Sequence, residues 1–524
     1  MRMVVRNWVR RNEYRDSVML MKASEDLRAV SGVMHAALMM GTQANKSVLE
    51  GLGLLDEQGR TARANDLLVA VQALDEDALG RAVDHVEAFL GGDRQGTTST
   101  SFHLLDSAVQ AVPDANLVLI SVPGQFAARE ARKALQHGLH VFLFSDDVPL
   151  QEEVSLKTTA SQKGLLLMGP ECGTAIINGV GLGFANAVRR GPIGIVAASG
   201  TGLQEVSVLI HRQGQGVSQA IGVGGRDLSD AVGGISTLQA LEALDADVDT
   251  RVIVLLSKPP SKATMDRVLK RAASCSKPVV VCFLGQDVLG PSDGVRLAKT
   301  LEEAAGMAVS LANGQTYEPR LFGISREDVD ELVAEELCGF APQQKYIRGL
   351  FSGGTLCYES MLVLKDSVGD VYSNAPLDDG FALQDVETSR AHTLVDMGEK
   401  HFTQGRPHPM IDPTLRKLRI LREARDPEVA VLLLDIVLGY GSHPDPAGAL
   451  ASSISEAKDQ VSDWGGHLSV VASICGTAED AQNLALQEDV LRQAGVLVMP
   501  SNAQASRLAG AIARCISVSE GCVG

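Results

Sequence analysis

Short apolar runs alternate with segments of helical spacing along almost the whole chain. In the first third, strand-type runs are expected at residues 3–8, 33–40, 116–122, 139–144 and 165–168. Further runs follow at residues 193–198, 252–256, 278–284, 346–351, 429–433 and 468–475. Strands that alternate with helices in this way are typical of parallel sheets covered by helices. We therefore predict an α/β fold made of several Rossmann- or flavodoxin-like parallel-sheet units.

Two stretches of the chain, residues 193–202 and 346–355, have almost the same pattern. Each is an apolar strand followed by a Ser-Gly-Thr or Ser-Gly-Gly-Thr turn, and each turn opens a segment with helical spacing. Ser and Thr at such a junction cap the helix, and Gly lets the backbone approach whatever lies above the turn.

The first-turn amides of a helix have no intrahelical partner, and the macrodipole adds partial positive charge there. A phosphate or carboxylate is therefore favoured at that end by about 0.3–2 kcal/mol. One such turn is a weak indication, because most strand-to-helix turns carry small residues only to make the corner. Two of them in duplicated surroundings favour an anion site, whose candidate phosphate-binding residues are Ser199, Gly200, Thr201, Gly202, Ser352, Gly353, Gly354 and Thr355.

The similarity of the two stretches extends to the strands that follow them. Residues 249–256 align with residues 426–433, and residues 278–285 align with residues 468–476. An internal repeat of this length predicts two similar sheets related by a pseudo-twofold axis. Such an axis would direct both helix starts at one spot.

Composition limits the classes of partner and compartment. The 524 residues carry a net charge of −17, which argues against a nucleic-acid binder, whose surface would be basic. The eight cysteines show no paired spacing, so neither a metal site nor a disulfide framework is indicated, and a cytoplasmic location is expected. No apolar run has the length of about 18 residues that a membrane span needs.

Three further turns are candidate ligand sites. The segment Gly41-Thr42-Gln43 after an apolar run is not a G-x-G-x-x-G motif and has no acidic residue placed to hold a ribose, so a nicotinamide dehydrogenase is disfavoured. Turns beginning at Pro123 and at Gly169 follow strands and would line a cleft or simply make a corner. Cys172, in the second of these turns, is a poor nucleophile candidate because nothing near it in sequence lowers its pKa.

These motifs together resemble a known family. Residues 122–128, 168–173, 198–202 and 221–225 resemble the succession of motifs in the α subunit of succinyl-CoA synthetase, and residues 346–500 resemble the carboxy-terminal ligase domain of its β subunit. The FdrA-like proteins resemble the chain most, through residues 123–128, Ser257-Lys258-Pro259-Pro260 and the long motif of residues 405–416.

The resemblance implies three units: a CoA-binding-type Rossmann domain at residues 1–188, an α-type ligase domain at 189–340 and a β-type ligase domain at 346–524. In the synthetases, one helix from each ligase domain points its N-terminus at a phosphohistidine, and the first domain binds coenzyme A. Here the coenzyme A contacts would fall on Gly41, Thr42, Gln43 and Lys46, with Pro123, Glu171 and Cys172 as further cofactor-binding candidates.

Three departures from the family change the expected chemistry. The chain has no histidine between His211 and His392, so the phosphorylated histidine loop after the strand near Gly285 is missing its histidine. The family's steadying glutamate would fall near Ser257-Lys258, where the chain has a base. No ATP-grasp domain precedes the third unit. We therefore expect that the chain does not move phosphate from ATP by itself.

Without the phosphohistidine, the site between the two helix starts would suit a free phosphate or a phosphorylated substrate. Lys258, Arg226, Arg406 and His408 are the candidate catalytic residues around it, since Arg offers a planar fork to an anion and Lys a point charge. Asp396 and Asp435 follow apolar runs and would orient these bases. For His408, in a proline-framed loop, a structural role is as well supported as a catalytic one.

The resemblance to FdrA-like proteins implies a multi-subunit carbamoyltransferase that converts oxalurate and phosphate into oxamate and carbamoyl phosphate in allantoin breakdown. Its cofactors would be phosphate as co-substrate and, as an option, coenzyme A; its partners would be a small anionic substrate and further subunits of an oligomer. Two alternatives stay open: an acyl-CoA synthetase whose partner supplies the ATP-grasp domain, and a non-catalytic scaffold.

Overall fold

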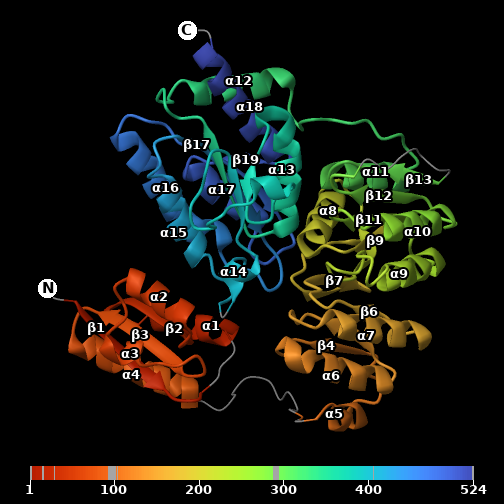
Figure 1. Cartoon of the computed structure of the whole chain (residues 1–524), viewed down its shortest axis with the longest axis horizontal. Coiled ribbons are helices and arrows are strands. Elements are labelled where there is room, and N and C mark those ends of the chain that lie inside the picture. The colour runs from red at the N-terminus through yellow and green to blue at the C-terminus, as the bar shows by residue number, and fades with distance from the viewer. Residues whose placement is uncertain are drawn as a thin grey trace. The chain divides into compact units, whose positions relative to one another are not determined.

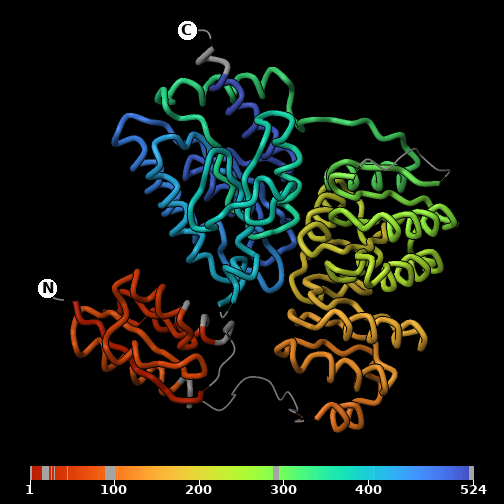
Figure 2. The backbone as a smooth tube through the Cα atoms, in the orientation of Figure 1, coloured from red at the N-terminus to blue at the C-terminus, as the bar shows by residue number. Residues whose placement is uncertain are grey.

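The computed structural model describes residues 3–13, 17–28, 30–91, 102, 104–286, 294–404 and 406–521, which form two compact units (Figures 1 and 2). The N-terminal unit comprises Met1–Ser101 and Gly398–Asp412, and the larger unit comprises Phe102–Met397 and Pro413–Gly524. Within the described residues, no helix has both the length and the apolar character needed to cross a bilayer.

The N-terminal unit is built on a three-stranded antiparallel sheet in the order β1-β3-β2. Apolar side chains of α1 and α4 pack with those of the sheet in one core. This order of elements is that of a split βαβ unit. The elements are β1 (Val4–Arg10), α1 (Ser17–Arg28), β2 (Val33–Met40), α2 (Gln43–Gly51), α3 (Glu57–Arg60), β3 (Leu67–Ala73), α4 (Glu76–Gly91) and, from the second segment, α14 (Lys400–Thr403).

This arrangement corrects the expectation of one parallel-sheet unit over residues 1–188. Most of the expected strands and helices are present, but β1, β2 and β3 form a sheet of their own, and residues 102–188 belong to the larger unit. Hydrophobic periodicity identifies strands without showing which strands pair or in which direction, so the pattern could not separate the two units.

Residues 102–183 supply a small parallel sheet and a hairpin. The sheet has the order β4-β5-β6, and the hairpin β7-β8 joins the sheet of the following repeat. The elements are α5 (Leu105–Ala111), β4 (Leu117–Ile120), α6 (Gly124–Gln136), β5 (His140–Leu143), α7 (Leu150–Gln162), β6 (Leu167–Met168), β7 (Thr174–Ile177) and β8 (Val180–Gly183).

The first repeat contributes five parallel strands to a seven-stranded sheet in the order β13-β12-β11-β9-β10-β7-β8, where only the β7-β8 hairpin is antiparallel. Strands β11 and β12 are buried on both faces, as in sheets covered by helices on both sides. The elements are β9 (Arg190–Ala197), α8 (Gly200–Arg212), β10 (Val217–Gly222), α9 (Ile235–Ala246), β11 (Val252–Ser257), α10 (Lys262–Ala273), β12 (Val279–Phe283), β13 (Val295–Leu297) and α11 (Leu301–Ala312).

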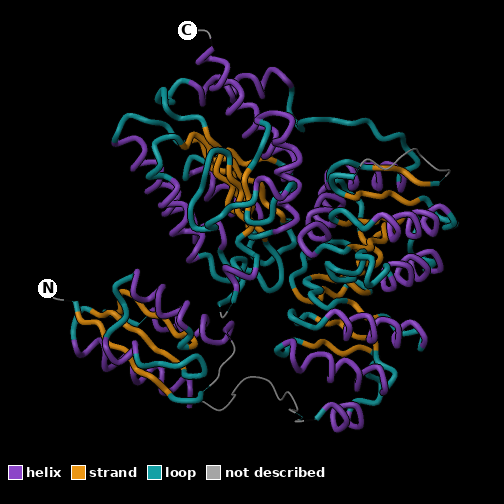
Figure 3. Tube along the Cα trace, viewed as in Figure 1, coloured by secondary structure: helices purple, strands orange, loops and turns teal. Residues whose placement is uncertain are grey.

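The second repeat is a six-stranded parallel sheet in the order β15-β16-β14-β17-β18-β19 (Figure 3, strands in orange). All nine residues of β17 are buried. The elements are β14 (Tyr346–Phe351), α13 (Gly354–Val368), β15 (Tyr372–Ser373), η1 (Asp379–Phe381), β16 (Thr393–Asp396), α15 (Thr414–Glu423), β17 (Val429–Val437), α16 (Pro446–Asp463), β18 (Ser469–Cys475), α17 (Leu484–Gln493), β19 (Leu497–Met499) and α18 (Asn502–Gly521).

The two sheets have the same topology, which confirms the internal repeat. The order β13-β12-β11-β9-β10 in the first repeat corresponds strand by strand to β19-β18-β17-β14-β16 in the second. This is the flavodoxin-like order, in which ligands bind outside the carboxyl ends of the central strands. The α/β fold with two repeated ligase-type sheets was therefore predicted correctly.

The boundary between the repeats differs from the expected end of the first ligase domain at residue 340. Helix α12 (Arg326–Leu337) packs against α18 of the second repeat (Figure 1). The Gly323 amide also donates to Gln504 Oε1 at 2.9 Å, and His467 Nε2 lies 2.8 Å from Glu336 Oε2. The chain therefore leaves the first repeat after α11, well before residue 340.

Glycines at the end of β10 let the Gly169–Thr174 turn pack directly on the first repeat. A Cβ added to Gly222 would lie 2.3 Å from the carbonyl oxygen of Thr174 and 2.6 Å from Cys172 Sγ. Gly224 has φ +87°, and its Cβ would lie 2.3 Å from the carbonyl oxygen of Pro170. This contact fixes the turn next to the carboxyl end of β10.

Gly222→Ala is expected to destabilise the larger unit by about 1–3 kcal/mol, because the added methyl group meets backbone that has little room to move. Urea denaturation followed by circular dichroism measures the effect. The control is Gly225→Ala, where an added Cβ meets nothing within 4 Å. Equal midpoints for the two variants would contradict this account of the packing.

Candidate functional site

Helices α8 and α13 begin at equivalent places, directly after the first strand of each repeat. Ser199 is the N-cap of α8, and its Oγ accepts a hydrogen bond from the Gly202 amide at 2.9 Å. Gly353 is the N-cap of α13. Both starts therefore lie at the carboxyl edge of a parallel sheet, where this topology places ligands.

The two helix starts are in direct contact. Ser199 Oγ and Thr355 Oγ1 are hydrogen-bonded at 2.6 Å, and the Thr355 amide lies 3.4 Å from Thr201 Oγ1. Figure 1 shows α8 and α13 side by side where the two repeats meet. The expected convergence of the duplicated turns is thus present in the structure.

Small residues make this approach possible. A Cβ on Gly202 would lie 3.1 Å from Thr355 Cγ2, and a Cβ on Gly353 would lie 3.0 Å from Thr201 Cγ2. Both distances are tighter than ordinary van der Waals contact. Gly202 and Gly353 therefore lie where the two turns contact each other.

The start of α13 is already occupied by a carboxylate of its own repeat. Asp435 lies within β17 and is fully buried. It accepts hydrogen bonds from the Ser352 and Gly353 amides at 2.8 and 2.7 Å and from Ser352 Oγ at 3.0 Å. Arg416 donates to Asp435 Oδ1 at 3.0 Å. Burial lowers the pKa of Arg416, and Asp435 opposes that shift.

A second buried carboxylate, Asp396, lies beside the same turn. A Cβ on Gly354 would lie 2.3 Å from Asp396 Oδ2, so only glycine fits there without a shift. The expected phosphate site at residues 352–355 is therefore corrected, because two carboxylates at this helix start disfavour another anion. Asp435 does hold a base, as expected, but the base is Arg416, which no sequence signal had singled out.

The start of α8 is different. Among the described residues, none accepts a hydrogen bond from the Gly200 or Thr201 amide. Thr174 Oγ1, on β7, is buried without a hydrogen-bond partner and lies 3.5 Å from the position of a Cβ on Gly200. Two amides and a hydroxyl therefore converge at a helix N-terminus, which is the arrangement that binds an anion.

Lys258 lies at the same sheet edge. It follows β11, which pairs with β9, and the Ala198 amide donates to the Leu256 carbonyl at 3.0 Å. Its Nζ lies 5.6 Å from the ring centroid of Tyr358, on α13. The half-buried lysine thus places a positive charge where the two repeats meet. Residues 287–293, where the family has its histidine loop, lie outside the described residues.

Arg226, by contrast, has structural partners. Its Nη2 pairs with Glu153 Oε2 at 3.0 Å and donates to the Val148 carbonyl at 2.8 Å. Glu153 also pairs with Lys157 at 3.0 Å, and Lys157 pairs with Asp227 at 2.7 Å, all three being fully buried. This network attaches α7 to the first repeat and gives Arg226 a positioning role there.

Arg406 and His408 belong to the N-terminal unit, within Gly398–Asp412. His408 holds a local turn: its Nδ1 accepts from the Met410 amide at 3.3 Å, and its carbonyl accepts from the Ile411 amide at 2.8 Å. These bonds agree with the structural interpretation of this histidine. A catalytic role for either residue stays a prediction.

The residues expected to hold coenzyme A are divided between the two units. Gly41, Thr42, Gln43 and Lys46 lie in the N-terminal unit, where Thr42 caps α2. Lys46 Nζ donates to the carbonyls of Arg60 and Ala62 at 3.3 and 3.0 Å. These residues follow β2, which belongs to an antiparallel sheet. The expected coenzyme A site assumed a junction between a parallel strand and a helix, and residues 41–46 do not form one.

Pro123, Glu171 and Cys172 lie in the larger unit, around the sheet β4-β5-β6. Pro123 is the N-cap of α6. Burial raises the pKa of Glu171, the charge of Arg226 opposes this shift, and the charges of Glu153, Asp146 and Asp147 add to it. Burial raises the pKa of Cys172 to about 12, so its thiol is inert at neutral pH. A role of these residues in holding coenzyme A stays a prediction.

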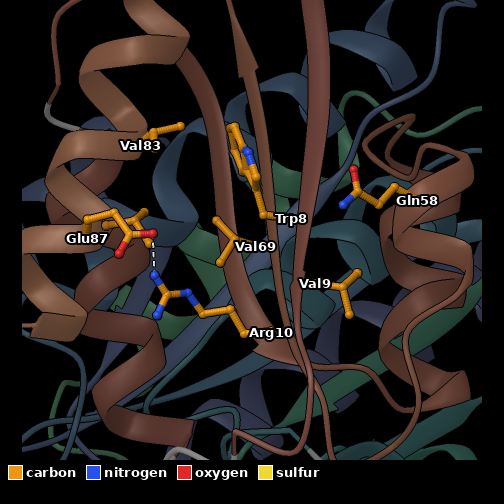
Figure 4. Close-up of a pocket in the computed structure, with 8 residues that line it drawn as sticks. Trp8, Val9, Arg10, Gln58, Val69, Val83 and Glu87 are labelled. Atoms are coloured by element: carbon orange, nitrogen blue, oxygen red, sulfur yellow. Dashed lines mark hydrogen bonds and ion pairs between the residues drawn. The ribbon is translucent and has the colours of Figure 1, made fainter.

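A cavity of about 230 Å³ lies within the N-terminal unit (Figure 4). An ion pair between Arg10 and Glu87 stands at one side of Trp8 and Val69. The lining residues are Trp8, Val9, Arg10, Gln58, Val69, Val83, Val86 and Glu87. The volume is below the roughly 300–1,000 Å³ of ordinary ligand pockets, so no ligand is assigned here.

Three family models match the chain. The CoA-ligase model covers residues 350–512, the CoA binding domain model covers residues 189–285, and a model described as "AllF, heavy metal-associated domain" covers residues 3–103. The first two matches coincide with the two repeats. The third coincides with the antiparallel N-terminal unit and supports its separation from the rest.

Residues 3–103 contain no cysteine, which is one of the ligands that soft heavy metals prefer, and the first cysteine of the chain is Cys172. Within the described residues, no group of three or more His, Cys, Asp or Glu side chains is placed to hold a metal ion. A cysteine-based heavy-metal site is therefore not available in residues 3–103.

Relatives of the chain point to one superfamily. The uncharacterized protein YahF of Escherichia coli (strain K12) is 46% identical over 517 residues, which is 97% of this chain and 98% of YahF. Subunit alpha 2 of the ADP-forming succinate–CoA ligase of Archaeoglobus fulgidus is 28% identical over 251 residues, 46% of this chain and 85% of that subunit.

Among solved structures, an apo acetyl-coenzyme A synthetase 1 of Ca. Korarchaeum cryptofilum covers 79% of this chain and 87% of its own, at 17% identity and a TM-score of 0.30. The full-length match to YahF, the two ligase-type matches and the duplicated flavodoxin-like sheets agree with one another. The chain belongs to the FdrA-like proteins of the succinyl-CoA synthetase superfamily.

Proposed function

We propose that this chain is a subunit of a phosphate-dependent acyl or carbamoyl transferase whose anion binds at the start of α8. The observation that carries the proposal is the group of unsatisfied donors there: the Gly200 and Thr201 amides, with the buried Thr174 hydroxyl beside them. Lys258 adds a positive charge at the same sheet edge. The anion would be the phosphate or a phosphorylated product.

The substrate we propose is oxalurate, with oxamate and carbamoyl phosphate as products. A phosphate oxygen would attack the carbamoyl carbon, forming a C–O bond while the bond from that carbon to the oxamate nitrogen breaks. The nitrogen would take up the proton that the phosphate gives up. Fixed donors at the α8 start and the charge of Lys258 would stabilise the negative charge that develops on the carbonyl and phosphoryl oxygens.

Several features favour this chemistry over ATP-driven thioester formation. No histidine occurs between His211 and His392, so the chain has no residue to carry the family's phosphohistidine. The two ligase-type repeats are nevertheless both present and in contact. The match of residues 3–103 to a model that carries the name AllF joins the FdrA-like resemblance in supporting a role in allantoin catabolism.

Additional subunits belong to the proposal. Succinate–CoA ligase relatives of the chain are named as alpha subunits, and we propose that this chain likewise acts within a larger oligomer. Its scattered cysteines, free where the structure describes them, suit a cytoplasmic location. The α8 start supplies anion binding only, so partner subunits would complete the oxalurate pocket.

A second candidate is an acyl-CoA synthetase whose partner supplies the ATP-grasp domain. The match of residues 189–285 to the CoA binding domain model favours it. The absence of a histidine between His211 and His392 counts against it. A non-catalytic scaffold would keep the folds and tolerate changes at the α8 start.

Phosphate dependence distinguishes the two enzymes. The complex purified with its native partners is expected to consume oxalurate only when phosphate is present, with carbamoyl phosphate as the second product, because the anion at α8 is the attacking group. Coupled detection of carbamoyl phosphate measures the rate. Formation of a CoA thioester that requires ATP would favour the acyl-CoA synthetase instead, and no turnover in either assay would favour the scaffold.

Lys258→Ala in that complex is expected to lower kcat/KM for phosphate by about 10- to 100-fold, because a charge next to the anion is lost. Lys258→Arg should restore part of the activity. Lys262→Ala, an exposed lysine at the start of α10, is the matched control and should leave the rate unchanged. If the chain were a non-catalytic scaffold, all three variants would bind the partner subunits equally well.

A further inference from the structure

The repeated helices α8 and α13 each carry a buried glutamate at the same position. Glu205 follows the N-cap Ser199 of α8 by six residues, and Glu359 follows the N-cap Gly353 of α13 by the same number. Glu205 is 2% exposed and Glu359 is 1% exposed. Buried glutamates at matching sites of both repeats, on the two helices that meet, indicate a shared role.

Each glutamate binds the start of a helix that belongs to the other repeat. Glu359 Oε1, in the second repeat, accepts a hydrogen bond from the Leu301 amide at the start of α11, at 2.7 Å. Glu205 Oε1, in the first repeat, accepts one from the Asn502 amide at the start of α18, at 3.1 Å. Each repeat therefore supplies the anion that the partner helix dipole favours.

Asn502 connects the two carboxyl groups. Its amide binds Glu205, while its Nδ2 donates to Glu359 Oε2 at 2.7 Å and to the Leu356 carbonyl at 3.0 Å. Asn502 is itself 1% exposed. Two acids thus meet at one buried side chain, and their charges repel each other across it.

No ion pair balances these two acids within the described residues. Arg507 is taken by Glu302 at 3.0 Å, and Arg212 donates to the carbonyls of Gly476, Pro500 and Ile474 at 2.7–2.9 Å. Burial is the main cause that raises the pKa of both acids, that of Glu359 to about 7. The titratable and charged groups that act on the pair from α8, α11, β12 and β18 are Arg212, Glu302, Cys282 and Cys475.

We propose that Glu205 and Glu359 form a proton-dependent lock between the two repeats, closed while the pair holds a proton and loosened when both acids are ionised. The lock acts on the contact between α8 and α13, since both glutamates lie on these helices. It is independent of the proposed activity, because it concerns only how firmly the repeats are held together.

The direction of the effect follows from the pKa of Glu359. A carboxyl whose pKa is higher in the folded than in the unfolded chain stabilises the fold at low pH, and that stabilisation is lost as the pH rises through the folded value. With an ordinary value of 4.5 and a folded value of about 7, the stabilisation begins to fall near pH 4.5, and its last part is lost between pH 6 and pH 8. Over that window the equilibrium constant for opening should rise about tenfold.

The test is hydrogen–deuterium exchange of the full-length protein at pH 6, 7 and 8, corrected for the intrinsic rate at each pH. Peptides that contain the Leu301 and Asn502 amides should lose about tenfold in protection between pH 6 and pH 8. Glu359→Gln should remove most of this pH dependence, because its side chain cannot ionise. Glu335→Gln, an exposed glutamate on α12, is the matched control and should behave like the wild type.

Constant protection of these peptides in the wild type from pH 6 to pH 8 would overturn the lock. An unchanged pH dependence in both Glu359→Gln and Glu205→Gln would overturn it as well. The wild-type series decides the question even where a variant does not fold. Infrared detection of a protonated carboxyl group at pH 6 that disappears at pH 8 in the wild type, and is missing in Glu359→Gln, should accompany the change in exchange.

Discussion

Two helix N-termini pressed against each other are the constraint around which the larger unit is built. Both ends carry partial positive charge, so their contact is unfavourable unless nearby groups offset it. The Ser199–Thr355 hydrogen bond joins the ends, and the Asp435 carboxylate accepts hydrogen bonds from the Ser352 and Gly353 amides just before α13. Glycines at both turns allow the separation to be this small.

In the part of the chain that the structure describes, a buried carboxylate offsets the positive charge at the helix start in the second repeat only. The two repeats have the same strand order but differ in this respect. Asp435 and Arg416 form a buried ion pair under α13, whereas the α8 start retains amides without an acceptor among the described residues. A duplicated scaffold can diverge in this manner: one copy of the motif becomes internal structure, and the other keeps its capacity to meet a ligand.

The sequence was sufficient for the duplicated architecture and for the meeting of the two turns, because strand patterns and Ser-Gly-Thr spacing are local signals. It was insufficient for the antiparallel N-terminal unit, since periodicity in β1, β2 and β3 does not encode pairing direction. Arg226 was misjudged because its partner Glu153 lies 73 residues earlier (226 − 153), on α7. Arg416 was missed because it is one of several charged residues in α15. Only the structure shows that it is buried and pairs with Asp435.

The assignment of Gly398–Asp412 to the N-terminal unit has a consequence for the covalent connectivity. The polypeptide passes between the two units three times, after Ser101, after Met397 and after Asp412. A single proteolytic cut near residue 101 would therefore leave two fragments that stay associated, because residues 398–412 of the larger fragment pack within the N-terminal unit. An isolated N-terminal fragment ending there would lack fifteen residues of its own unit (398–412), so a faithful excised domain requires both segments joined artificially.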